Sequence, residues 1–483
     1  MVQRALLLSF LSLCLGFVAS QSNAATNFGL LATATVPVKA VDSTGETLGG
    51  FCSGMWWDGT SRSLYCLPDR GPMDGKVDYR PRVQEFALSI DLTRASSALV
   101  TGNLILTNTS TRLLHDETGH VFSGFDANDT AAAAPRVAVT NVSSAPRAID
   151  PEGIVRAPDG SFYISDEYGP FVYHFDADFR MVGVIQPPSH FLPKRGGKVH
   201  FSAVGNPDSG RTANHGFEGL GITPGGDQLW AALQKPLVQD CYRDGQKVKN
   251  AHFTRVLTWS LRDATPQLTG EYAYPLDLEV GGAKAASVGE ILVLNDKQFL
   301  VLEHDARGLG SGKPEMKDKQ LCRIYLASLS DATNLGEIEG TPYSREAGDP
   351  KGRALDGAEL PSPLKAISKI LLVDLMEPTV LAKAGIRDAS QMPEKWEGMA
   401  LVPDPSMPQG QYLLLVGVDN DFKTYQTFVR TTAQTDGVKL DVATPSGEEV
   451  PSLVFAFRVE LLEYVPPVPQ INKTQTKSNS NGG

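Results

Sequence analysis

The sequence lacks the motifs that mark several common enzyme classes. It contains no G-x-S-x-G nucleophile elbow, no H-E-x-x-H zinc motif, no Walker loop and no G-x-G-x-x-G in a strand–helix–strand setting. Stretches with helical periodicity are also nearly absent, and the one helix we expect spans residues 378–389. The sequence therefore gives no support to an α/β-hydrolase, a zinc metalloprotease or a nucleotide-binding α/β domain.

Positive charge and long apolar runs are scarce as well. The chain has 44 basic and 55 acidic residues, a net charge of −11, and no basic cluster that could follow a phosphate backbone. No apolar run after residue 19 approaches the roughly 18 residues of a membrane-spanning helix. We therefore expect neither a nucleic-acid partner nor a membrane anchor.

The N-terminus has the pattern of a secretory signal peptide. Residues 1–4 carry one positive charge, and the apolar run over 5–19 is too short for a comfortable membrane span, although a membrane anchor is the alternative interpretation. Small residues place the expected cleavage after Ser20 or Ala24. We expect a secreted, extracellular protein with a signal peptide over residues 1–20. One domain over 27–465 and a polar, disordered tail over 466–483 should follow.

Only five cysteines are present, and Cys14 lies in the expected signal peptide. The other four are an even number in an oxidising compartment, which favours disulfides over free thiols. Cys52 and Cys66 flank the polar segment 58–62, which we expect to be a hairpin turn. We therefore predict a Cys52–Cys66 bond and, by elimination, a Cys241–Cys322 bond. Glycosylation sequons occur at Asn108, Asn128, Asn141 and Asn472.

Short segments of alternating apolar and polar residues recur along the chain, separated by Gly, Pro, Asn and Asp. This pattern is typical of an all-β protein. Five segments share one order of strand, turn and second strand, and they begin at residues 52–55, 151–154, 217–220, 288–291 and 396–399. Copies this far apart suit the blades of a β-propeller. The 22 to 24 strands that can be drawn favour roughly six blades with loop insertions, with seven possible and a pair of β-sandwiches as the alternative.

Acidic residues recur at two positions of the repeat. The first position holds Glu152, Glu218, Glu290 and Glu397, while the first copy has Ser53 there; the second holds Asp69, Asp166, Glu167, Glu303 and Asp419. The innermost strands of a propeller line its channel, so equivalent positions should form rings. Crowded carboxylates repel one another unless a cation compensates them, and Ca²⁺ prefers oxygen ligands. The sequence therefore predicts a calcium site; the alternative is that these acids cap backbone amides or face solvent.

Several residues at or near these acidic positions are candidates for substrate binding or catalysis. Arg70 and Arg307 follow acidic positions and could hold an anionic oxygen, as phosphoester cleavage requires. His215 lies beside a repeat motif and could act in acid–base catalysis. Glu152 and Glu218 are the expected catalytic acids. For each of the two arginines and for His215, an ordinary polar contact is the alternative.

Three groups of residues together resemble the phytase-like family, which is also described by esterase-like activity of the phytase type. They are the run 150–154 with its partner 165–170, the run 214–220, and the segment from Glu290 to Glu303. The resemblance covers about Leu48 to Phe422. It implies a propeller with repeated Glu and Asp that hydrolyses ester or phosphoester bonds. Ser53 and the spacing of Asp305-Ala306-Arg307 depart from the family pattern.

We therefore expect a secreted, calcium-dependent hydrolase that acts on a small-molecule or phosphorylated ester substrate. Two alternatives remain open. One is a non-catalytic extracellular propeller that binds calcium and a partner, and the other is a lactonase-type propeller.

Overall fold

The computed structural model describes residues 29–127, 147–243, 246–247, 251–279, 284–311, 320–337, 360, 362–403, 407–424, 427–432, 438–440 and 449–466. The expected signal peptide and the sequons at Asn128, Asn141 and Asn472 lie outside these residues, as does the expected tail beyond Pro466. Within the described residues, no helix has the length and apolar character of a membrane span.

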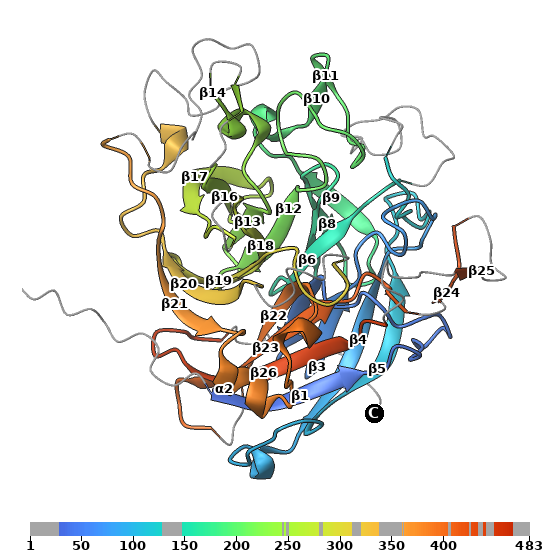
Figure 1. Cartoon of the computed structure of the whole chain (residues 1–483). Coiled ribbons are helices and arrows are strands. Elements are labelled where there is room, and N and C mark those ends of the chain that lie inside the picture. Colours follow the sequence, from blue (N-terminus) through green and yellow to red (C-terminus); the bar gives the residue numbers. More distant parts are fainter. Residues whose placement is uncertain are drawn as a thin grey trace, which may run out of the picture.

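The described residues form a β-propeller of five four-stranded antiparallel sheets, with inner strands β6, β12, β18 and β22 near the centre of the view in Figure 1. The first blade is β2 (Gly54–Asp58), β3 (Ser63–Leu67), β4 (Arg82–Ile90) and β5 (Leu104–Leu113). The second is β6 (Pro151–Arg156), β7 (Phe162–Asp166), β8 (Val172–Phe175) and β9 (Met181–Ile185). The third is β12 (Phe217–Ile222), β13 (Gln228–Leu233), β16 (Phe253–Ser260) and β17 (Gln267–Pro275). The fourth is β18 (Ser287–Val293), β19 (Gln298–His304), β20 (Cys322–Ser328) and β21 (Ser368–Asp374).

The fifth blade joins the two ends of the described chain. It contains β22 (Lys395–Pro403), β23 (Gln411–Asp419), β26 (Ser452–Glu460) and, as its outermost strand, the N-terminal β1 (Gly29–Val36). Strand β1 pairs antiparallel with β26. The ring is therefore closed by backbone hydrogen bonds between residues more than 400 positions apart.

The prediction of a propeller is confirmed, but the expectation of six blades is wrong for the described residues. Three short hairpins account for the surplus of strands: β10 (Lys194–Arg195) with β11 (Lys198–Val199), β14 (Tyr242–Arg243) with β15 (Gln246–Lys247), and β24 (Thr427–Val429) with β25 (Val438–Leu440). They lie in insertions between blade strands. A count of strands divided by four therefore overestimates the number of blades.

Apolar side chains that alternate along the strands pack between neighbouring blades. Tyr65 meets Phe162 between the first and second blades, and Trp230 meets Phe299 between the third and fourth, each pair with ring centroids 5.3 Å apart. The expected helix at 378–389 is shorter than predicted: α2 (Pro378–Lys383) ends before Gly385, which has a φ of +73°. Glycine favours this left-handed conformation, which terminates helices.

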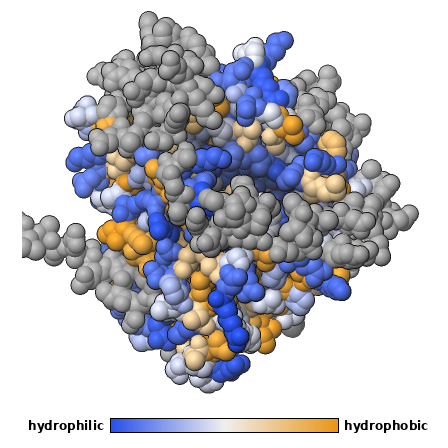
Figure 2. Space-filling view, in the orientation of Figure 1, coloured by the Kyte–Doolittle hydropathy of each residue, from blue (hydrophilic) through white to orange (hydrophobic). Residues whose placement is uncertain are grey.

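The connections between strands differ at the two ends of the channel. Inner strands begin, and second strands end, at the same edge of each sheet, which we call the acidic end. The connections that follow β5, β9, β13 and β23 therefore begin and end at this edge. At the other edge, the apolar end, the second to fourth blades turn from the first to the second strand within 157–161, 223–227 and 294–297. In the face shown in Figure 2, hydrophilic side chains surround a hollow below the insertions that carry β10 and β14.

The cysteines do not form the predicted bonds in the structure. Cys52 and Cys66 are nevertheless in contact, and burial together with a hydrogen bond to Cys66 raises the pKa of the Cys52 thiol. Their pairing is compatible with the structure and stays a prediction. Cys322 lies in the apolar cluster between the fourth and fifth blades, whereas Cys241 ends η3 (Val238–Cys241) in the third blade's insertion. The structure therefore gives the second pairing no support.

Asn108 is the one sequon within the described residues, and its side chain is engaged. The amide nitrogen donates hydrogen bonds to Gln84 Oε1 and to the carbonyl oxygens of Glu85 and Ser110. A glycan on this nitrogen would replace some of these bonds, so glycosylation at Asn108 stays a prediction that the packing does not favour.

The five inner strands approach one another closely through glycines. A Cβ atom added at any of these glycines would lie closer than 3.0 Å to the next inner strand. The contacts are Gly54 with Glu152 O, Gly153 with Leu220, Gly219 with Ile291 N, Gly289 with Trp396 O, and Gly398 with Met55 Cγ. The glycine of each repeat is therefore a requirement of the narrow ring.

Substitution of Gly54 by alanine should lower the melting temperature, because its Cβ would overlap the backbone oxygen of Glu152 and push two inner strands apart. Overpacking of this kind costs about 1–3 kcal/mol. Gly59→Ala is the matched control, since a Cβ there has nothing within 4 Å. Thermal unfolding followed by circular dichroism measures both. Equal melting temperatures would contradict the account of the ring.

Candidate functional site

Three glutamates meet where bulges interrupt the inner strands. In β12 the pairing with β13 shifts between Phe217 and Gly219, so Glu218 has no partner across the ladder. Glu397 has the same place in β22, and Glu152 lies in the shift between Pro151 and Ile154 of β6. A bulge turns the extra residue out of the ladder. As a result, Glu152, Glu218 and Glu397 each bring a carboxylate oxygen within 4.8 Å of the other two.

Glu290 does not join these three glutamates, which corrects the prediction, because it lies one residue after the bulged position. In β18 the shift lies between Val288 and Glu290, so Gly289 occupies the bulged position. Glu290 Oε1 instead accepts hydrogen bonds from the backbone nitrogens of Leu220 (3.0 Å) and Ile291 (2.9 Å). In this blade glycine precedes glutamate (Gly289-Glu290), whereas the motifs of β6, β12 and β22 have glutamate before glycine. The side chain of Glu290 therefore lies between the inner strands.

Of the acids predicted at the second repeat position, Asp69, Glu167 and Asp419 lie in clusters with other carboxylates, whereas Asp166 and Glu303 do not. The strand registers place Asp69, Glu167 and Asp419 at one equivalent position, at or just beyond the ends of the second strands, where the other two blades carry Gln234 and His304. Carboxylate oxygens of Glu167, Glu152 and Asp150 lie within 4.8 Å of one another, as do those of Asp69, Asp419 and Asp421. We call Glu152, Glu167, Glu218 and Glu397 the glutamate group, and Asp69, Asp419 and Asp421 the aspartate group.

Asp166 and Glu303 are not part of either group, which corrects the prediction for both. Asp166 accepts hydrogen bonds from the backbone nitrogens of Asp150 (3.0 Å), Tyr168 (3.1 Å) and Gly169 (2.9 Å). Glu303 accepts from Tyr274 Oη (2.6 Å), Asp277 N (2.8 Å) and Lys369 Nζ (2.5 Å). Each lies one residue before the repeat position that Asp69, Glu167 and Asp419 share. Their side chains instead hold turns and neighbouring strands in place.

The glutamate group is buried and short of positive charge. Burial raises the pKa of Glu152 well above its usual range, and repulsion from Glu218 adds to this effect. Burial raises the pKa of Glu218 to about 8. The pKa values of Glu167 and Glu397 are also raised, first by burial and then by neighbouring carboxylates, although Arg70 and Lys395 oppose the shift. Burial and mutual repulsion therefore oppose ionisation of all four groups together, and a further cation would relieve this.

Four buried oxygens of the glutamate group have no hydrogen-bond partner among the described residues. They are Glu152 Oε2, Glu167 Oε1, Glu218 Oε2 and Glu397 Oε2. Buried polar atoms are rarely left unsatisfied, and such exceptions often mark an ion or water. Ca²⁺ takes 6–8 oxygen ligands in flexible geometry, and it commonly includes water and backbone oxygens among them. The oxygen-only donor set of the glutamate group therefore fits Ca²⁺.

Two cationic side chains lie next to these acids. Arg70 is one of them: Nη1 lies 2.6 Å from Asp150 Oδ2 and 3.7 Å from Glu167 Oε2, and it also contacts Asn214. Its role in binding an anionic oxygen stays a prediction. Lys395, which the sequence reasoning missed, lies 2.8 Å from Asp419 Oδ2 and 3.3 Å from Glu397 Oε1. The available signal was its place directly before the Trp396-Glu397 motif.

Arg307 and His215 are less well placed for the predicted roles. Arg307 Nη2 pairs with Glu279 Oε2 at 2.9 Å, and its Nε lies 3.6 Å from Asp305 Oδ2. His215 Nδ1 lies 3.2 Å from Thr212 Oγ1. Burial, helped by the charge of Lys235, lowers the pKa of His215 to about 3. A histidine with this pKa is neutral at physiological pH, which argues against a role as general acid.

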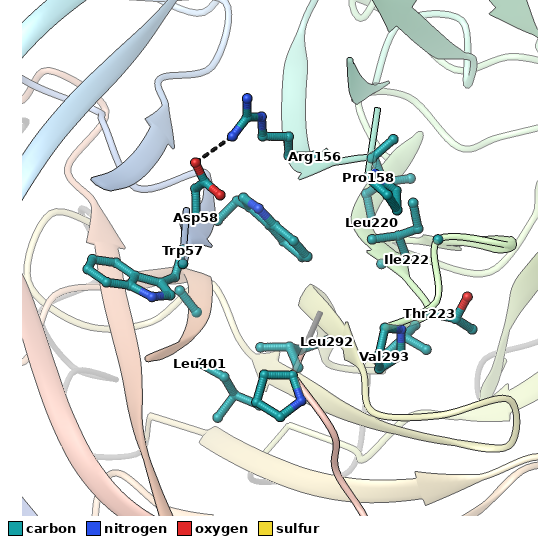
Figure 3. A pocket seen from close by; sticks show the side chains of 18 of the residues that line it. Trp57, Asp58, Arg156, Pro158, Leu220, Ile222, Thr223, Leu292, Val293 and Leu401 are labelled. Carbon is teal, nitrogen blue, oxygen red and sulfur yellow. Dashed lines mark hydrogen bonds and ion pairs between the residues drawn. The ribbon is translucent and has the colours of Figure 1, made fainter. Parts of the chain in front are cut away.

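The apolar end of the channel offers a different environment. A cavity of about 240 Å³ is lined there by the later residues of the inner strands and by their turns (Figure 3). Leu220, Val293 and Leu401 are among its walls, and the ion pair of Asp58 with Arg156 lies at its edge. Among the described residues, the side-chain nitrogens and oxygens that line this cavity are not left buried without a partner. The cavity therefore suits apolar groups, and the buried carboxylate oxygens without a partner among the described residues lie outside its lining.

Comparison with known proteins identifies the family to which this chain belongs. The family model named Phytase-like, described as esterase-like activity of phytase, matches residues 46–422, which include both groups. An "Uncharacterized secreted protein" of Arthroderma benhamiae is 32% identical over 457 residues, covering 82% of this chain and 87% of that protein. The crystal structure of the Myceliophteria thermophila Cps50 (Swd1) β-propeller domain matches 84% of this chain and 83% of its own, with 8% identity. Its TM-score is 0.28, so that likeness carries no argument. The family match and the Arthroderma relative show that this chain belongs to the Phytase-like family.

Proposed function

We propose that this protein is a secreted hydrolase of phosphate or other esters, and that the glutamate group binds the Ca²⁺ ion on which the reaction depends. The observation that carries the proposal is the set of four buried carboxylate oxygens without partners. The family description supports the ester chemistry. The apolar N-terminal run and the secreted relative support export from the cell.

The charge balance of the acidic end supports a cation there. A buried carboxylate that has no partner either takes up a proton or binds a positive ion. Glu152 and Glu218 have no ion pair among the described residues, whereas the nearby Asp150 is paired with Arg70. Oxygen-only donors favour Ca²⁺, while Zn²⁺ sites usually include nitrogen or sulfur ligands. Calcium is therefore the expected ion.

Each residue of the site has a role in this proposal. Glu152, Glu167, Glu218 and Glu397 would supply the ligands, and a bound divalent cation would polarise the ester and lower the pKa of a water molecule. Arg70 lies beside the glutamate group, and its Nε is buried without a hydrogen-bond partner. Its guanidinium would bind an anionic oxygen of the substrate. The long connections above the acidic end would surround the rest of the substrate.

One observation favours a second function, a non-catalytic propeller that binds calcium structurally. Glu218 and Glu397 are each only 1% exposed. A cation held by such side chains would stabilise the ring even if no substrate reached it. The two functions differ in whether ester turnover accompanies calcium binding.

Removal of calcium should lower the melting temperature markedly. A ligand that binds only the folded state stabilises it by about 2.7 kcal/mol at one hundred times its Kd. Thermal unfolding in EDTA, followed by addition of excess Ca²⁺, measures the effect, and elemental analysis of the untreated protein checks for bound calcium. An unchanged melting curve, together with no calcium in the protein, would contradict a metal site.

Without calcium, stability should fall as the pH rises from about 4.5 to about 8. In this range an unfolded glutamate loses its proton near its ordinary pKa of 4.5, but folded Glu218, with its pKa raised to about 8, keeps the proton to higher pH. The folded state therefore binds more protons, and higher pH favours unfolding. Melting temperatures in EDTA between pH 5 and pH 8 measure the slope. Glu218→Gln should reduce the slope, while Glu463→Gln, at an exposed position, should keep it. The same slope in both variants would refute the assignment to Glu218.

Glu152→Gln and Glu218→Gln should each abolish most ester turnover, because each removes a charged ligand of the Ca²⁺ ion on which the reaction depends. The substitution keeps the size of the side chain and removes its charge, so circular dichroism should show an intact fold. Glu463→Gln is the control and should keep wild-type turnover. The hydrolase proposal fails if both site variants retain full activity. It also fails if the wild type, with calcium present, cleaves none of a panel of phosphate and carboxylic esters; a calcium-binding propeller would then take its place.

A further inference from the structure

The aspartate group is a second cluster of acids at the same end of the channel, and it resembles a cation site. Carboxylate oxygens of Asp69, Asp419 and Asp421 lie within 4.8 Å of one another. Asp69 and Asp419 are buried. Two adjacent acidic clusters of this kind raise the question of how many cations the channel holds.

Two members of the aspartate group already contact a positive charge from the chain itself. Lys395 Nζ lies 2.8 Å from Asp419 Oδ2, 2.8 Å from Asp421 Oδ1 and 3.3 Å from Glu397 Oε1. The lysine is fixed by the sheet, because Lys395 at the start of β22 pairs directly with Asp419 on β23. An ammonium group is a compact charge with three donors, and here three carboxylates surround it.

The two groups differ in whether their buried oxygens are satisfied. Every member of the glutamate group has an oxygen without a partner, whereas none of the carboxylate oxygens of Asp69, Asp419 and Asp421 is among the unsatisfied buried atoms of the described residues. Glu397 belongs to both environments: Oε1 faces Lys395, and Oε2 remains without a partner. The glutamate group therefore still needs a cation, and the aspartate group does not.

We infer that Lys395 fills the cation position of the aspartate group, so that the channel takes a single divalent cation, held by the glutamate group. This inference rests on the proposed calcium site and specifies its stoichiometry. Lys395 is accordingly a positioning residue: it orients Glu397 and keeps a second ion out. Its loss should open a second calcium site formed by Asp69, Asp419 and Asp421.

The test is the number of calcium ions bound by the full chain. Native mass spectrometry and isothermal titration calorimetry with CaCl₂ should give one ion for the wild type and two for Lys395→Met. Lys395→Arg keeps the charge and should remain at one. Lys423→Met is the matched control: Lys423 Nζ pairs with Asp421 Oδ2 and Glu394 Oε1, each at 2.6 Å, but Lys395 would still occupy the cluster. That variant should also bind one ion.

The outcomes separate this inference from the proposed function. Two ions in the wild type would overturn the inference without need of any variant, and would leave a calcium-dependent function standing. A folded Lys395→Met protein that binds no more calcium than the wild type would also overturn it. No ion in the wild type but one in Lys395→Met would refute the proposed site in the glutamate group and still support the role of Lys395.

Discussion

The close approach of the five inner strands is the constraint on which the rest of the structure depends. Where each strand passes its neighbour, a glycine removes the side chain that would otherwise keep them apart. Beside three of these glycines, at 153, 219 and 398, a bulge turns a glutamate out of the ladder. The narrow ring therefore forces Glu152, Glu218 and Glu397 together in a buried space. A wider ring would let the same carboxylates face solvent separately, and the need for a cation would disappear.

The chain meets the resulting repulsion in two ways. Lys395 neutralises the aspartate group from within, and Arg70 neutralises Asp150. The blades also differ where a uniform ring of acids would be untenable. Gly289 stands at the bulged position of β18 and Ser53 at the equivalent place before β2, while Gln234 and His304 stand where other blades carry Asp69, Glu167 and Asp419. These differences between blades reduce the number of carboxylates that meet in the channel. The acids therefore form one concentrated site in place of a continuous ring.

The sequence alone predicted those features of the fold and the site that recur from one repeat to the next. The alternating strands predicted a propeller, and the recurring acids predicted one ring that includes Glu152, Glu218 and Glu397 and a second that includes Glu167. The incorrect predictions concern features that differ from one repeat to the next. A one-residue exchange of Gly and Glu redirected Glu290, and a one-residue offset turned Asp166 and Glu303 away from the channel. Hairpins inside insertions inflated the number of blades, and Lys395 was missed because only one blade has a lysine there.

The most direct test of this account is to locate the cation in a crystal of the full chain. Diffraction near the calcium or manganese absorption edge would show a bound ion as an anomalous peak. The account predicts one peak in the channel, with glutamate oxygens of 152, 218 and 397 at about 2.3–2.6 Å if the ion is Ca²⁺. A channel without any peak at saturating calcium, or a single peak among Asp69, Asp419 and Asp421, would contradict it.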